Sequence, residues 1–194
     1  MTKVESSFKN MVISLTLISI VASAGLGAIY EYTKEPIAQS NLRKKIEAIK
    51  QVVPEFNNNP YEEMLRLPTG EGDELVDVYP AKMNGNVVGY AVSTYTNMGF
   101  SGDIFLMAGF NADGSICDIT VIEHKETPGL GTKMEEPKFK NQFKGIHPAE
   151  VNIKVKNDGR QIDGITAATI SARAFSDAVQ RAYNTLEKGG LIYE

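Results

Sequence analysis

The longest apolar stretch of the chain lies near its N-terminus. Residues 11–30 read MVISLTLISIVASAGLGAIY and contain no charged side chain. At about 1.5 Å rise per residue, a helix of this length spans roughly the 30 Å hydrocarbon core of a bilayer. The pattern therefore predicts one transmembrane helix at residues 11–30, after a short N-terminal segment at residues 1–10.

A secretory signal peptide is the alternative for the same stretch. Lys3 and Lys9 precede the apolar run, and the small residues at 22–24 are typical of a cleavage site. The uninterrupted length favours a retained anchor. The charges do not decide the orientation of the helix. More basic residues follow the span than precede it, which by itself would place the folded domain in the cytoplasm, but this rule weakens for long translocated domains.

Residues 31–73 are predicted to form an amphipathic helix and a connector. Apolar residues recur at helical spacing before Pro54, which cannot continue a helix. These apolar residues are Leu42, Ile46, Ile49 and Val53. The stretch from Asn57 to Asp73 is rich in Asn, Pro, Gly and acidic residues and is typical of a connector.

From Leu75 the apolar pattern changes to that of strands. Two pairs of β-rich runs flank turn residues, Asn84-Gly85-Asn86 in the first pair and residues 111–114 in the second, which predicts two antiparallel hairpins. We expect their aromatic residues in the core: Tyr90, Tyr95, Phe100, Phe105 and Phe110. A proline- and glycine-containing loop at 126–148 and a short strand at 151–155 follow.

The last segment has apolar residues on one helical face from about Ile170 to Lys188, before Gly189-Gly190. It is predicted to be a packed C-terminal helix. The fold class is therefore α+β, in which an N-terminal transmembrane helix precedes an antiparallel-sheet domain at residues 74–194 that ends in a helix.

Composition narrows the function. The chain has 194 residues, 42% hydrophobic and 23% charged, with a net charge of -4, so it is globular and lacks the basic surface that nucleic acid requires. Cys117 is the only cysteine, which excludes an intrachain disulfide and a cysteine-ligated cluster. His124 and His147 lack metal-ligand spacing, so we expect no metal site. Any redox chemistry of this chain would therefore need a bound cofactor.

The candidate chemistry lies before the C-terminal helix, in residues 163–169, which read DGITAAT. A hydroxyl at a helix start can cap free backbone N–H groups, and the same N–H groups can bind a phosphate. From the residues alone, Thr169 could do either.

Two motifs in this order resemble one family. The segment Asp163 to Thr169, with its Thr166-Ala167-Ala168-Thr169 core, and the loop EHKETPGLGTK at 123–133 are similar to the G subunit of Rnf electron-transport complexes. The C subunit of sodium-pumping NADH:quinone oxidoreductases shares the same FMN-binding domain. Family members usually have glycine where this chain has Ala167, and alanine tolerates positive φ poorly.

The resemblance implies that FMN is joined by a phosphoester to Thr169, transferred from FAD by a separate flavin transferase. Asp163 would be recognised or positioned by the transferase, or would instead cap backbone N–H groups of the turn. The loop 127–132 would supply a surface for the ring, because its glycines let backbone approach closely, and Lys133 would supply charge near it. The expected cofactor-binding residues are Thr169, Asp163, Thr166, Ala168, Ser171, Thr127, Gly129, Leu130, Gly131, Thr132 and Lys133.

The resemblance also implies a single-pass inner-membrane subunit with a cytoplasmic segment at 1–10 and its folded domain outside the cytoplasm. With other membrane and iron–sulfur subunits, it would relay electrons in a ferredoxin:NAD oxidoreductase that translocates ions. The chain would not be catalytic alone, since it has no GxGxxG motif for a dinucleotide. The alternatives are a C-type subunit of the sodium-pumping enzyme and a flavin-free, membrane-tethered scaffold.

Overall fold

The computed structural model describes residues 7–69, 74–155 and 162–192. The chain divides into two compact units, Met1–Arg43 and Lys44–Glu194, which are described separately below. Residues 1–6 of the expected N-terminal segment and 70–73 of the expected connector lie outside the described residues.

The first unit consists of most of helix α1 (Phe8–Val52). This helix is long and apolar enough to cross a membrane, and the side chains of its most apolar stretch are exposed, unlike those of a core helix in a soluble domain. A signal sequence would pass the same test of length and composition. Pro36 lies inside one continuous helix, which includes both the predicted span and the predicted amphipathic residues.

The second unit contains a five-stranded antiparallel sheet in the order β1-β2-β3-β4-β5. Its strands are β1 (Leu65–Pro68), β2 (Leu75–Met83), β3 (Asn86–Thr96), β4 (Ile104–Asn111) and β5 (Ile116–His124). Both predicted hairpins are confirmed. In the first, Asn84 and Gly85 have φ of 53° and 86°, the conformation that a two-residue hairpin turn requires. The edge strand β1 lies within the segment expected to be a connector.

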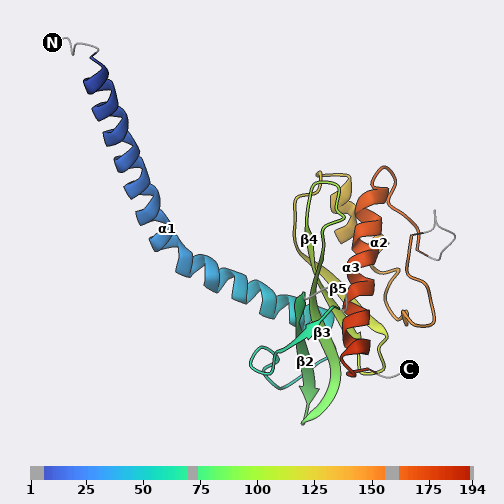
Figure 1. Cartoon of the computed structure of the whole chain (residues 1–194). Helices are drawn as coiled ribbons and strands as arrows, with labels where there is room; N and C mark the ends of the chain where they lie inside the picture. The colour runs from blue at the N-terminus through green and yellow to red at the C-terminus, as the bar shows by residue number, and fades with distance from the viewer. Residues whose placement is uncertain (1–6, 70–73, 156–161, 193–194) are drawn as a thin grey trace. The chain divides into compact units, whose positions relative to one another are not determined.

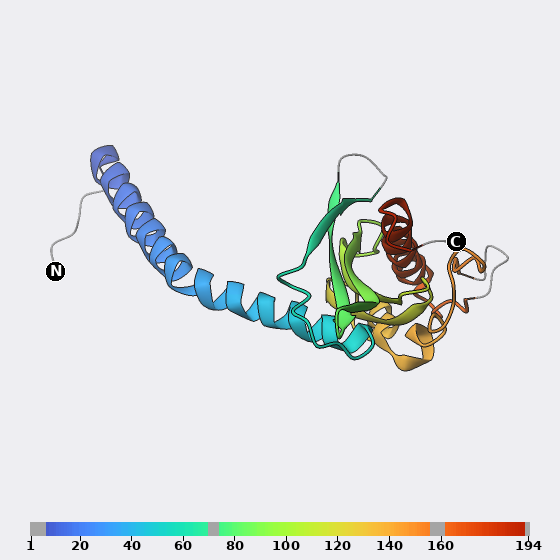
Figure 2. The same cartoon turned by 90° about the horizontal axis from the view of Figure 1, so that it is seen from below.

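Helix α3 (Thr169–Lys188) covers one face of the sheet, alongside β3 and β4 (Figures 1 and 2). Its predicted apolar face is confirmed as buried: Ala172, Phe175, Ala178, Val179, Ala182, Tyr183 and Leu186. The 126–148 segment contributes η1 (Gly131–Glu135) and α2 (Pro137–Lys140), and Phe139 and Phe143 pack against Phe175. The core below the start of α3 is therefore aromatic and rigid.

The end of α1 covers the other face of the sheet within the second unit. Ile49 and Val52 are buried with Tyr79 and Met107. The helix end lies so close to β4 that a Cβ added at Gly109 would be 1.8 Å from the carbonyl oxygen of Val52. Glycine is the residue that permits this approach.

Two expectations about the second unit are wrong. Phe100 is 68% exposed because it lies in the loop between β3 and β4, and Phe105 is 39% exposed because it alternates along β4 with the buried Ile104 and Leu106. The 151–155 segment is not a strand, since Val155 forms only an isolated bridge to Ile162. Cys117 is half-buried, and this burial raises the pKa of its thiol.

Candidate functional site

The segment before α3 forms a tight turn, called the acceptor turn here, at residues 165–168. The backbone N–H of Ala168 donates to the carbonyl oxygen of Ile165 at 3.0 Å, and Ala167 has φ of 63°. A positive φ at the third position of a turn normally selects glycine. The missing glycine noted in the sequence therefore falls at a position that is strained by alanine.

Helix α3 begins directly after this turn. Ala168 is the N-cap residue and no side chain caps the helix, so the capping alternative for Thr169 is wrong. Among the described residues, the Thr169 hydroxyl has no hydrogen-bond partner. The first turn contains no acidic residue. Its unsatisfied backbone N–H groups and the helix dipole favour an anion at this end.

A second turn faces α3 from the loop after β5. The backbone N–H of Leu130 donates to the carbonyl oxygen of Thr127 at 3.2 Å, with Gly129 at φ of 75°. Pro128 and Gly129 occupy the positions that a type II turn prefers for them. The N–H of Gly129 also donates to Thr132 Oγ1 at 2.9 Å, which fixes the turn against the start of η1.

A cavity of about 360 Å³, called the Thr169 cavity here, lies between these turns. Its lining comes from the β3–β4 loop, the second turn and the start of α3. The lining residues are Phe100, Glu126, Thr127, Leu130, Gly131, Ala167, Ala168, Thr169, Ile170 and Ser171. Phe100, Leu130 and Ile170 are large exposed apolar side chains. The cavity therefore combines an apolar wall with an anion-binding helix end.

One buried carboxylate belongs to this lining. Glu126 is 5% exposed, and its Oε2 accepts a hydrogen bond from Ser171 Oγ at 2.6 Å. Its Oε1 accepts one from the backbone N–H of Ser101 at 3.0 Å. The backbone N–H of Glu126 donates to His124 Nδ1 at 3.0 Å. Glu126 thus connects the β3–β4 loop to the first turn of α3.

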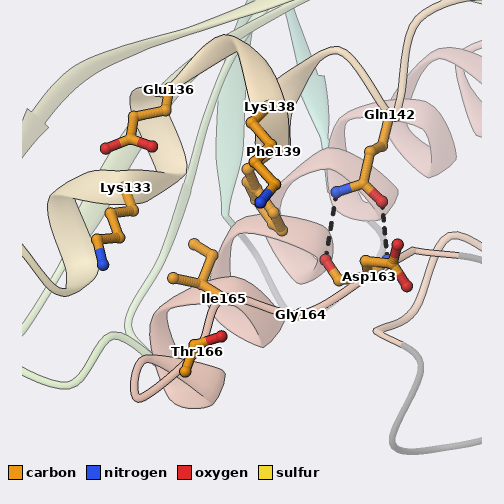
Figure 3. Close-up of a pocket in the computed structure, with 9 residues that line it drawn as sticks. All are labelled: Lys133, Glu136, Lys138, Phe139, Gln142, Asp163, Gly164, Ile165 and Thr166. Carbon is orange, nitrogen blue, oxygen red and sulfur yellow. Dashed lines mark hydrogen bonds between the residues drawn. The ribbon is translucent and has the colours of Figure 1, made fainter.

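A second cavity of about 420 Å³, called the Asp163 cavity here, lies beside η1, α2 and the residues that precede α3 (Figure 3). Lys133, Glu136, Lys138, Phe139, Gln142, Asp163, Gly164, Ile165 and Thr166 line it. Gln142 holds the backbone of Asp163 at both groups. Its Oε1 accepts from the Asp163 N–H at 2.8 Å, and its Nε2 donates to the Asp163 carbonyl oxygen at 3.3 Å.

The structure separates the residues that the sequence motifs grouped together. Six of them line the Thr169 cavity: Thr127, Leu130, Gly131, Ala168, Thr169 and Ser171. Lys133, Asp163 and Thr166 line the Asp163 cavity. Gly129 and Thr132 bond to each other in the second turn.

Several lining residues were not predicted from the sequence as site candidates, among them Phe100, Ile170, Gln142 and Glu126. Phe100 was expected in the core, although the glycines at 99 and 102 on either side of it indicate a loop. Ile170 was expected as part of the packed helix, and Gln142 carried no signal. Glu126 lies inside the recognised loop motif, but nothing in the pattern indicates its burial.

Metal chemistry finds no support in the described part of the chain. Within residues 7–69, 74–155 and 162–192, no group of three or more His, Cys, Asp or Glu side chains could hold a metal ion. Histidines 124 and 147 are hydrogen-bonded instead, to Glu135 Oε1 at 2.9 Å and to the Asp113 carbonyl oxygen at 2.8 Å.

Comparison with known proteins agrees with this arrangement. Residues 99–184 match the FMN-binding domain family. The chain is 32% identical over 188 residues to the G subunit of the Na(+)-translocating ferredoxin:NAD(+) oxidoreductase complex of Acetobacterium woodii, covering 90% of each chain. It is 33% identical over 188 residues to the G subunit of the ion-translocating oxidoreductase complex of Haemophilus influenzae strain PittEE, covering 93% of this chain and 89% of the relative.

A solved structure shares the fold. The crystal structure of the C subunit of Na(+)-translocating NADH-quinone reductase from Parabacteroides distasonis superimposes with a TM-score of 0.55, covering 80% of this chain and 94% of that one. Sequence identity in this pair is 16%, so the likeness concerns the fold alone.

Proposed function

The chain belongs to the G-subunit family of ion-translocating oxidoreductase complexes, and we propose that it relays electrons in such a complex through FMN esterified to Thr169. The match to the FMN-binding domain family supports FMN as the cofactor. When bound, FMN supplies the reversible electron acceptance that a relay requires. The chain acts as one electron-transfer component of the complex and is not an enzyme alone.

One observation carries the attachment site. The hydroxyl of Thr169 has no partner among the described residues and lines a cavity at the N-terminus of a 20-residue helix. The other two hydroxyl residues nearby are placed differently: Ser171 donates to buried Glu126, and Thr166 lines the Asp163 cavity. Thr169 is therefore the one of these three hydroxyls that both lines the Thr169 cavity at the helix end and has no partner among the described residues.

The residues around Thr169 fit a flavin phosphate and ring. The backbone N–H groups at the start of α3 would bind the phosphate, since no acidic side chain in the first turn opposes it. Phe100, Leu130 and Ile170 would cover the ring and exclude water. The peptide of Gly129 is open to a flat ligand, because no atom lies within 4 Å of the position where its Cβ would be. Lys133 lines the neighbouring Asp163 cavity, and we propose that it contacts the edge of the flavin ring from there.

Maturation and topology complete the proposal. A flavin transferase would engage Asp163 and move FMN from FAD to Thr169. Residues 11–30 would form the single transmembrane helix in the inner membrane, after a cytoplasmic segment at 1–10 and before the helix and connector of 31–73. The domain at 74–194 would lie outside the cytoplasm and exchange electrons with other membrane and iron–sulfur subunits.

The test is coexpression of the full chain with a flavin transferase, followed by intact mass and peptide mapping. The wild-type chain is expected to carry one FMN-sized adduct on the peptide that contains Thr169, and fluorescence should persist on a denaturing gel. Thr169→Val should abolish both signals. Ser171→Ala is the matched control, because it removes a neighbouring hydroxyl that is already bonded to Glu126.

Two results would overturn the assignment. An adduct that survives in Thr169→Val would place the ester elsewhere. A wild-type chain, purified from its native complex, that weighs only what its amino acids weigh would leave the flavin-free scaffold. Identification of the copurifying proteins would separate the G-type assignment from the C-type alternative, which the 32–33% identity to the G-type relatives already disfavours.

A further inference from the structure

We propose that the buried carboxylate of Glu126 lowers the reduction potential of the flavin carried by this domain. The inference rests on the proposed function, since it requires FMN in the Thr169 cavity. Glu126 would act on the flavin through its charge from a fixed position in the cavity lining.

The carboxylate is held in place from several sides. Ser171 Oγ donates to Oε2 at 2.6 Å and the Ser101 N–H donates to Oε1 at 3.0 Å. A Cβ added at Gly99 would lie 2.9 Å from Oε1, and one added at Gly131 would lie 2.6 Å from Oε2. The two glycines therefore leave room for the carboxylate, since a side chain at either position would crowd it.

No cation balances this charge among the described residues. Neither a described lysine nor a described arginine forms an ion pair with Glu126, although several acidic residues elsewhere in the second unit are paired in this way. The two donors to Glu126 are neutral groups. A buried, hydrogen-bonded charge without a counter-ion keeps much of its field, because little water screens it.

The chemical effect follows from the sign of the charge. Reduction adds electrons to the flavin ring and favours anionic forms near a positive group. A fixed negative charge opposes reduction for the same reason. A unit charge on the order of 10 Å away, at an effective dielectric constant of about 20, changes the ratio of reduced to oxidised flavin by roughly tenfold. That change corresponds to about 30 mV for a two-electron couple.

Glu126→Gln isolates the charge from the packing. The glutamine side chain has almost the same shape, its carbonyl oxygen can accept from the Ser101 N–H, and its amide can donate to the Ser171 hydroxyl. Ser171→Ala is the matched variant. It removes the hydrogen bond to Oε2 and keeps the carboxylate.

The experiment uses full chains loaded by coexpression with a flavin transferase. Intact mass first establishes that each variant carries FMN, so absence of flavin from the wild-type chain would refute the proposed function separately. Potentiometric titration followed by flavin absorbance then measures each potential. At a fixed solution potential, we expect Glu126→Gln to raise the ratio of reduced to oxidised flavin by roughly tenfold. Ser171→Ala should not raise this ratio.

Three outcomes would overturn the proposal. The first is a loaded Glu126→Gln protein with the wild-type potential. The second is an equal upward shift in Ser171→Ala, which would assign the effect to the hydrogen bond. The third is a folded Glu126→Gln chain, verified by its thermal melting curve, that accepts no flavin; Glu126 would then serve maturation.

Discussion

The two cavities beside the acceptor turn differ in what holds them together. The Thr169 cavity is fixed by a buried carboxylate that links loops far apart in the sequence. The Asp163 cavity is fixed by one glutamine, half-buried, that bonds the backbone of a single residue. The Thr169 cavity is therefore held by contacts between distant parts of the sequence, whereas in the Asp163 cavity the hydrogen bonds fix the backbone conformation at Asp163.

This difference suggests that the two sides of the segment 163–171 have different functions. The Thr169 side has the apolar wall and the helix end that a permanent cofactor needs. The Asp163 side carries charged residues at its edge and suits a transient partner such as the transferase. Substitutions on the two sides should therefore affect different measurements.

Gly131→Ala should have the largest effect, on the Thr169 side. Its added Cβ would lie 2.6 Å from Glu126 and 2.9 Å from Ser171 Oγ. Overpacking of this kind costs about 2 kcal/mol, so we expect a lower midpoint of denaturant unfolding and reduced flavin loading by mass.

Gly129→Ala is the matched control for this substitution. Its added Cβ meets no atom within 4 Å, and only the φ of 75° opposes alanine. A cost of about 1 kcal/mol in denaturant unfolding is expected, smaller than that of Gly131→Ala. Equal effects of the two substitutions would show that contact with Glu126 does not matter.

Gln142→Ala should have a smaller effect, on the Asp163 side. It removes both hydrogen bonds to the backbone of Asp163, worth about 1 kcal/mol together at this partly exposed site. Loading by the transferase should become slower, because the recognised segment is less ordered. Chains that have been loaded should keep the wild-type flavin spectrum and potential. A changed potential would contradict the division between the two sides.

Ala167→Gly should have the smallest effect, in the turn that the two sides share. Alanine at φ of 63° is strained by about 1–2 kcal/mol, which glycine would relieve. Glycine also loses more conformational entropy on folding, and this cost offsets about half of the relieved strain. We expect stabilisation by about 0.5 kcal/mol in denaturant unfolding. Asn84→Gly is the contrasting control: asparagine tolerates its φ of 53° and its Oδ1 accepts a hydrogen bond from Asn57 Nδ2 at 3.0 Å, so no such gain is expected there.

The elements predicted correctly are those with a local signal. The hairpin at Asn84-Gly85 and the apolar face of α3 are specified by adjacent residues. Strand β1 was missed because four residues that end in proline give too short a pattern.

In the candidate site, too, only the features with a local sequence signal could be predicted. Thr169 and the loop after β5 are candidates from motifs, and the missing glycine at residue 167 marks a position that has a positive φ in the structure. The burial of Glu126 depends on partners 25 and 45 residues away along the chain. Phe100 lines the cavity only because the β3–β4 loop meets the start of α3. Such juxtapositions arise from tertiary packing and leave no periodic trace in the sequence.

The bond between Ser171 and Glu126 also bears on stoichiometry. Three hydroxyl side chains occur between residues 166 and 171, yet one of them is committed to a buried carboxylate and another lies in the Asp163 cavity. Of these three, only Thr169 combines a hydroxyl without a partner among the described residues with a place in the Thr169 cavity, which makes it the single proposed acceptor oxygen. Each polypeptide is expected to be loaded once, in a single mass step, without a ladder of multiply modified forms.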